Sequence, residues 1–100
     1  GSDLNGVLQL VKLNPLLNEP LVADYPYTKA LVVFAARNEY ARRVEDVLAR
    51  RFRLLFLDAK AAVKAAPEVA RLLAHELGQG KEWIEKEIND FNELARAYLV

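Results

Sequence analysis

The sequence predicts an all-α protein, a small irregular bundle of five to six helices that forms a single domain. Apolar residues recur at intervals of three and four positions along most of the chain, which is the spacing of one helix face. Hydrophobic residues make up 53% of the 100 residues, enough for one packed core and too many for a disordered chain. Prolines and glycines stand between the periodic segments, where helices begin and end.

The first helix is expected over residues 3–13, with Ser2 as its N-cap. Its apolar face consists of four residues at helical spacing: Leu4, Val7, Leu8 and Val11. Pro15 ends this helix, because the residue before a proline is pushed out of the helical region, and a short turn follows over residues 16–19. Residues 20–27 contain two of the four prolines and are expected to form an extended connector.

Thr28 is expected to cap a second helix over residues 29–40. This segment is apolar nearly all round, so it should be the central buried helix. A strand is the alternative at the β-branched pair Val32 and Val33. The surrounding Ala, Lys and Glu residues and the lack of alternation favour the helix.

A third helix is expected over residues 44–53 or beyond. Its apolar face is Val44, Val47, Leu48, Phe52 and Leu55. Asp46 and Arg50 are four positions apart, so they can pair on its surface. The continuous apolar run over residues 54–57 either continues this helix or forms a turn.

Asp58 is the next N-cap signal, and it is expected to begin an alanine-rich helix over residues 59–66. Because proline is well tolerated in the first turn of a helix, Pro67 is expected to begin a separate helix over residues 67–77. Gly78 should end that helix in the left-handed conformation.

The last helix is expected over residues 81–99. Its apolar face is Ile84, Ile88, Phe91, Ala95 and Tyr98. Acidic residues crowd its first half and Arg96 lies near its end, which matches the helix dipole. We find no internal repeat and no low-complexity segment along the chain.

Charge is balanced over the whole chain but uneven along it. The formal net charge is zero, which argues against a field that attracts nucleic acid or anionic lipid. Residues 37–53 hold six arginines and three acids, whereas residues 81–100 hold three basic residues and five acids. Either these two regions attract each other or are simply solvated, or the basic face meets an acidic surface or a phosphate elsewhere. The use of Arg without Lys in residues 37–53 favours planar, bidentate hydrogen bonding.

The sequence predicts no catalytic, cofactor-binding or metal-ligating residue. It contains neither a GxGxxG motif nor a phosphate-binding P-loop, and it has no cysteine. The single histidine, His75, begins a HELGQ segment in which Gln79 replaces the second histidine of a zinc-protease helix, so it is interpreted as a surface residue. The paired carboxylates are interpreted as solvated helix faces. Ser2 stands at the terminus and cannot form a serine–histidine pair.

Several segments together resemble a known family. They are Pro26-Tyr27-Thr28, Arg37-Asn38-Glu39-Tyr40-Ala41, EDVLARRFR over residues 45–53, LFLDA over residues 55–59, AAPEVARLLAHELG over residues 65–78, and Tyr98-Leu99. Over nearly its whole length the chain is similar to the C-terminal helical domain of the FAD-dependent glycerol-3-phosphate dehydrogenases, a domain shared with alpha-glycerophosphate oxidase. Two positions depart from the family pattern: Asn38 stands where His is usual, and Phe52 where Thr is usual.

The resemblance implies a parent enzyme that oxidises sn-glycerol 3-phosphate to dihydroxyacetone phosphate. Hydride passes to FAD, and electrons then pass to membrane quinone or, in the oxidases, to oxygen. The FAD and substrate sites belong to a large N-terminal region, so this chain is expected to bind no FAD and no metal and to be inactive alone. We expect a cytoplasmic location, with the parent enzyme at the cytoplasmic face of a membrane.

The resemblance also suggests what this chain does. It is expected to pack as an auxiliary domain against the catalytic region, with five residues at or near the contact: Glu45, Asp46, Arg50, Arg51 and Arg53. The alternative is a free-standing helical module that binds an acidic or nucleic-acid partner through its arginine-rich face. Attachment of this chain to a membrane surface is disfavoured, because no expected helix combines a basic face with a large exposed apolar face.

Overall fold

The computed structural model describes residues 2–99, with side chains described from Asn5 onward. Its helical segments, in chain order, are α1 (Ser2–Leu13), η1 (Pro15–Asn18), α2 (Lys29–Asn38), η2 (Asp46–Arg51), α3 (Leu54–Leu57), α4 (Ala59–Leu77), α5 (Lys81–Ala95) and η3 (Arg96–Tyr98). Over the described range the extended residues pair only at an isolated antiparallel bridge between Pro20 and Thr28. The predicted all-α fold class is therefore confirmed.

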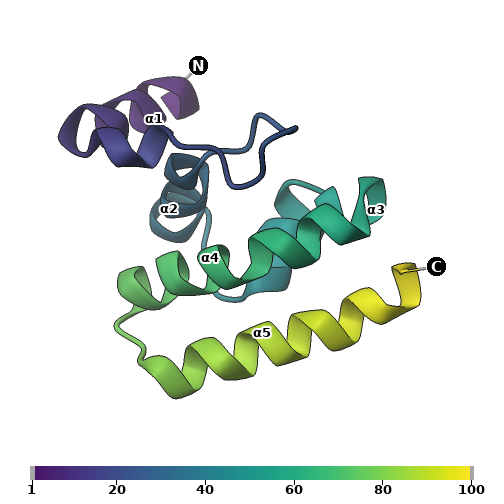
Figure 1. The fold of residues 1–100 in the computed structure, drawn as a ribbon. Coiled ribbons are helices and arrows are strands. Elements are labelled where there is room, and N and C mark those ends of the chain that lie inside the picture. Colours follow the sequence, from purple (N-terminus) through teal and green to yellow (C-terminus); the bar gives the residue numbers. More distant parts are fainter. Residues whose placement is uncertain (1, 100) are drawn as a thin grey trace.

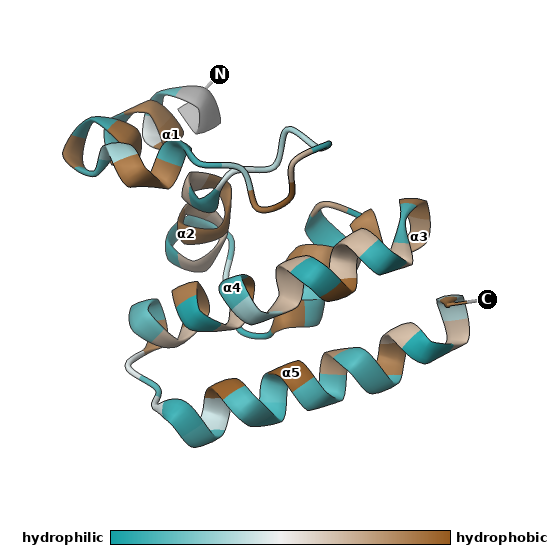
Figure 2. Ribbon diagram, in the orientation of Figure 1, coloured by the Kyte–Doolittle hydropathy of each residue, from teal (hydrophilic) through white to brown (hydrophobic). Residues whose placement is uncertain are grey.

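The bundle is built on α4 and α5, which lie side by side and are joined by a short glycine-containing turn (Figure 1). Helix α2 packs on the other side of α4, and α1 lies beyond α2, away from α5. The main core lies between α2, η2, α3, α4 and α5. Its largest fully buried side chains are Phe91, Leu48, Leu54, Leu55, Leu73, Val32, Val44, Val47 and Val69. Figure 2 shows the polar face of α5 turned outward, with apolar residues at helical intervals.

The prediction of two helices on either side of Pro67 is wrong, because α4 is one helix of 19 residues that runs through the proline. Pro67 has no N–H and so removes one hydrogen bond of the helix. Buried residues nevertheless continue on the same face before and after it, including Ala62, Ala66, Val69 and Leu73. Packing of this continuous face against α2 and α5 outweighs the lost hydrogen bond.

The helix expected over residues 44–53 also differs from the prediction. It begins at Val44 as predicted, widens into the π-helix η2 and ends at Arg51, and the N–H of the capping residue Phe52 donates to the Val47 carbonyl at 2.8 Å. Arg53 then takes a left-handed conformation with φ of 57°, so residues 54–57 form the separate short helix α3. The wider π turn lets Val47, Leu48 and Phe52 all reach the core.

Smaller expectations at helix ends had mixed outcomes. Asp58 caps α4 by accepting from the Ala61 N–H at 3.1 Å, and Gly78 ends it with φ of 68°, both as predicted. Thr28 occupies the cap position of α2, but its side chain makes no capping hydrogen bond. Helix α2 ends at Asn38, and α5 ends at Ala95 before the 3₁₀ turn η3.

The apolar face predicted for the first helix is partly wrong. Leu8 is 51% exposed, whereas Leu10 is buried. The reason is that α1 approaches α2 through Gly6, which lies against the ring of Phe34. The capping role predicted for Ser2 and the burial predicted for Leu4 fall outside the described side chains.

Candidate interdomain surface

The arginine-rich segment, residues 37–53, contains a helix whose start at Val44 is held by a carboxylate from α5. Glu87 is 5% exposed, and its Oε1 accepts a hydrogen bond from the Val44 N–H at 2.9 Å. Its Oε2 accepts from Arg43 Nε at 3.2 Å. The first N–H groups of a helix have no partner within that helix, so Glu87 supplies one across the core. The hydrogen bond from Arg43 Nε to Glu87 is the main reason that the pKa of Arg43 is raised.

Asp46, which lies within this helix, also binds backbone N–H groups at its start. Its Oδ2 accepts from the backbone N–H groups of Arg42 and Arg43, each at 3.0 Å. The predicted surface pair between Asp46 and Arg50 is therefore wrong, because the carboxylate is turned back toward the start of the helix. Glu45 Oε1 lies 3.4 Å from Arg43 Nη1.

Three arginines outside the predicted contact residues have partners inside the domain. Arg43 pairs with Glu87 and, at 3.1 Å, with Asp90, which confirms for this residue that the basic segment and the acidic last helix attract each other. Arg42 donates to the carbonyls of Ala36 and Ala41. Arg37 pairs with Glu76 at 2.6 Å on the far side of α2.

The predicted contact residues Arg50, Arg51 and Arg53 differ in their surroundings. Arg51 pairs with Glu39 at 2.8 Å. Arg50 and Arg53 are exposed, and neither forms an ion pair with a residue in the described part of the chain. The guanidinium of Arg53 lies over the Phe56 ring at 5.3 Å. Exposed cations of this kind can accept a carboxylate or phosphate from another surface.

A surface hollow of about 500 Å³ brings several of these residues together. It is lined by Ala35, Glu39, Tyr40, Ala41, Asp46, Arg50 and Arg51. Three of the five predicted contact residues therefore meet there, while Glu45 and Arg53 lie outside the hollow. The sequence analysis missed Tyr40, which is 81% exposed and has φ of 59°. Its place just after an apolar helix, where glycine is usual, was the available signal.

The hollow offers recognition chemistry and no reactive group. It presents two guanidiniums, two carboxylates and a phenol, and neither a histidine nor a serine lines it. His75, the only histidine, lies elsewhere. Across the described residues, no group of three or more His, Asp or Glu side chains is placed to hold a metal ion.

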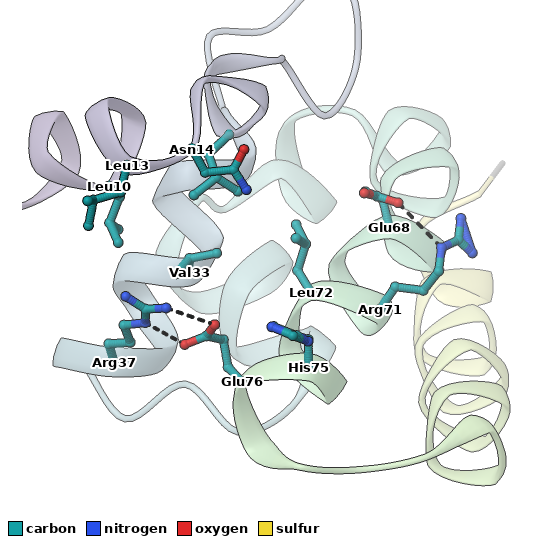
Figure 3. A pocket seen from close by; sticks show the side chains of 11 residues that line it. Leu10, Leu13, Asn14, Val33, Arg37, Glu68, Arg71, Leu72, His75 and Glu76 are labelled. Atoms are coloured by element: carbon teal, nitrogen blue, oxygen red, sulfur yellow. Dashed lines mark hydrogen bonds and ion pairs between the residues drawn. The ribbon is translucent and has the colours of Figure 1, made fainter.

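A second hollow, of about 470 Å³, lies between α1, η1, α2 and α4 (Figure 3). Its apolar lining consists of Leu10, Leu13, Leu17, Val33 and Leu72. The charges on its rim pair with one another, Arg37 with Glu76 and Arg71 with Glu68, as the dashed lines in Figure 3 show. This hollow therefore suits apolar groups rather than a charged ligand.

Comparison with known proteins identifies the family. Residues 1–84 match the family model described as the C-terminal domain of alpha-glycerophosphate oxidase. The chain belongs to this family. The match includes the whole arginine-rich segment and ends within α5, before Glu87. The predicted family resemblance is therefore confirmed.

The chain also has relatives that are named as glycerol-3-phosphate dehydrogenases. The chain is 39% identical over 85 residues to the Caenorhabditis elegans protein named "Probable glycerol-3-phosphate dehydrogenase, mitochondrial". It is 34% identical over 85 residues to the mitochondrial glycerol-3-phosphate dehydrogenase of Homo sapiens. In both cases the alignment covers 85% of this chain and 11% of the relative. The relatives are oxidoreductases, and the chain spans about a tenth of their length.

No solved structure matches the chain significantly. Within residues 2–99, none of the helices has the length and apolar character needed to cross a lipid bilayer. The comparisons give no support to the alternative of a free-standing module that binds acidic or nucleic-acid partners.

Proposed function

We propose that this chain is the C-terminal auxiliary domain of an FAD-dependent glycerol-3-phosphate dehydrogenase and packs on the catalytic region of that enzyme. The 11% share of the relatives' length supports a role as one part of a larger protein. The observation that carries the docking role is the exposure of Arg50 and Arg53 without a carboxylate partner among the described residues, whereas the other arginines of residues 37–53 have partners within the domain.

The five contact residues take different roles in this proposal. Arg50 and Arg53 face the catalytic region directly. Arg51 contacts it while paired with Glu39. Asp46 and Glu45 stabilise the conformation of the segment through their contacts with Arg43. Guanidiniums suit such a contact because they bind carboxylates in a bidentate manner.

The residues of this chain do not fit an FAD site. A dinucleotide site is built from a strand, a glycine-rich loop and a helix N-terminus. The sequence has no glycine-rich loop of this kind, and the hollow beside Arg50 is an open surface lined by charged side chains. We therefore assign FAD and the substrate site to the rest of the enzyme and derive no chemical step from this domain.

The reaction belongs to the whole enzyme in this proposal. That enzyme oxidises sn-glycerol 3-phosphate to dihydroxyacetone phosphate, FAD accepts the hydride, and electrons pass on to a quinone at a membrane surface. The names of the relatives place those proteins in mitochondria. A location at the cytoplasmic face of a membrane stays a prediction for this protein.

The experiment compares the isolated chain with the full-length enzyme. We expect the purified 100-residue chain to be colourless and to show no oxidation of sn-glycerol 3-phosphate with an artificial electron acceptor. The full-length enzyme should carry flavin absorbance and turn the substrate over. Flavin bound stoichiometrically by the isolated chain, or turnover by it, would contradict the assignment.

A further inference from the structure

Tyr40 is the most exposed aromatic side chain in the described part of the molecule, at 81%. It follows α2 in a left-handed conformation, with φ of 59°. This turn lets the Ala41 N–H donate to the Ala35 carbonyl, which also accepts from the Glu39 N–H. Glycine is the usual residue at such a position, because a left-handed backbone is unfavourable for a residue with a bulky side chain. Local structure therefore gives no reason for a tyrosine here.

Burial within the domain gives no reason either, since the residue is largely exposed and its ring lies beside a cation. The guanidinium of Arg42 lies over the Tyr40 ring at 5.3 Å. That guanidinium is held in place by the carbonyls of Ala36 and Ala41, at 3.0 and 2.9 Å. The ring is therefore presented to the outside beside a fixed positive charge.

The surroundings of Tyr40 have the composition of a binding hot spot. Tyr40 lines the hollow that also contains Arg50 and Arg51. Tyr and Arg are the residue types that most often contribute the main part of the binding energy at protein interfaces, where the surrounding contacts exclude water. Arg50 has no ion pair within the described residues, and residues 37–53 carry three more positive than negative charges. A partner surface should therefore combine a pocket for an aromatic ring with a carboxylate.

We infer that Tyr40 anchors this domain to the catalytic region, with its ring in an apolar pocket of that region and Arg50 paired to a carboxylate beside it. The inference rests on the proposed function. The occupant is the remainder of the same enzyme, because the chain covers only 11% of relatives that share this segment. Buried at a contact, the ring compensates for the unfavourable backbone that it imposes on the isolated domain.

The test measures amide hydrogen exchange in the isolated chain and in the full-length enzyme. We expect the N–H groups of residues 39–51 to exchange more slowly in the full-length enzyme. Tyr40→Asn suits the test because Asn tolerates the left-handed conformation. In the isolated chain this change should leave the melting temperature unchanged or raise it. In the full-length enzyme it should reduce the added protection by about thirtyfold, the loss expected for a hot-spot residue.

The matched control is Tyr98→Asn, which removes another exposed tyrosine on η3 and should leave the protection unchanged. Added protection confined to α1, or to α3 and η3, would overturn the anchor while leaving the auxiliary-domain proposal intact. The same holds if Tyr40→Asn keeps the full protection. No added protection anywhere in the full-length enzyme would contradict the packing proposal itself.

Discussion

Glu87 in α5 accepts a hydrogen bond from the backbone N–H of Val44 at 2.9 Å, and the two residues are 43 positions apart in the chain. The contact joins a part of the chain outside the family match to the first residue of the helix in the arginine-rich segment, which lies inside the match. A buried carboxylate thus fixes the helix end on which the proposed contact surface depends.

Replacing Glu87 should destabilise the whole domain. Glu87→Ala leaves the buried Val44 N–H without a partner and removes one partner of Arg43. We expect a loss of about 2–3 kcal/mol in the free energy of unfolding, measured by urea denaturation. The control is Glu85→Ala, an exposed residue on the same helix, which should change stability by less than about 0.5 kcal/mol. Equal effects of the two variants would refute the capping role of Glu87.

Stability should fall in acid partly through Asp58. Hydrogen bonds from the Ala61 N–H and then from the Tyr25 hydroxyl, the latter at 2.9 Å, hold the pKa of Asp58 below its ordinary value of about 4. A carboxyl with a lowered pKa in the folded state stabilises the protein above its unfolded pKa. That contribution is lost as the pH falls through the lowered value.

Asp58→Asn tests this dependence, because Asn is also a good N-cap and does not titrate. The variant lacks the contribution of the ionised carboxylate, so it should be less stable than the wild type near neutral pH, and the difference should shrink in acid. Below a pH of about 4 its free energy of unfolding should fall less steeply than that of the wild type. Urea denaturation across a pH series measures both curves, and parallel curves in acid would contradict the role of this carboxylate.

Pro67→Ala should stabilise the domain. The new N–H can donate to the Val63 carbonyl one turn earlier in α4. An interior proline costs a helix about 3 kcal/mol, and its rigidity in the unfolded chain returns about 1 kcal/mol, so we expect a net gain of roughly 2 kcal/mol. Pro15→Ala is the control, because Pro15 opens η1, where proline is well tolerated. A gain from both changes, or from neither, would contradict the explanation given for α4.

Gly6→Ala should weaken the packing of α1 on α2. A Cβ atom at Gly6 would lie 2.5 Å from Cε2 of Phe34. Overpacking of this kind costs about 1–3 kcal/mol, against about 1 kcal/mol gained in helix propensity, so a net loss of about 1 kcal/mol is expected. Asn5→Ala, at an exposed neighbouring position, should instead give a small gain. Thermal unfolding of both variants separates the two cases.

The fold class and most helices could be predicted from the sequence, because helical periodicity reports directly on which residues are buried. Asp58 and Gly78 were predicted correctly since their roles depend only on neighbouring residues. Pro67 was misread because a local rule about proline was overridden by packing on both sides of it. The π-helix η2 could not be predicted, since its width is set by which side chains reach the core.

The candidate surface was predictable only in part. The surplus of arginine was visible in the composition, but the partner of each arginine depends on tertiary contacts. Arg43 meets Glu87 because α5 folds back along the segment, and Asp46 turns toward its own helix end instead of Arg50. Tyr40 was missed because an exposed residue leaves no periodic signal.

The docking claim is tested most directly by replacing Arg50 and Arg53 together with Ala, in the isolated chain and in the full-length enzyme. Arg51 is left in place, because its pair with Glu39 also serves the domain itself. The matched control is Lys81→Ala with Arg96→Ala, which removes the same charge from exposed positions on α5 and η3.

The measurement is the turnover of sn-glycerol 3-phosphate by the full-length variants, beside the free energy of unfolding of the isolated ones. We predict that R50A/R53A leaves the isolated chain within about 0.5 kcal/mol of wild type and weakens docking by about 1.5–3 kcal/mol for each lost charged hydrogen bond, so that turnover falls at least tenfold. The control double variant should keep wild-type turnover. Full turnover by R50A/R53A in a stably folded enzyme would contradict the claim that this surface packs on the catalytic region.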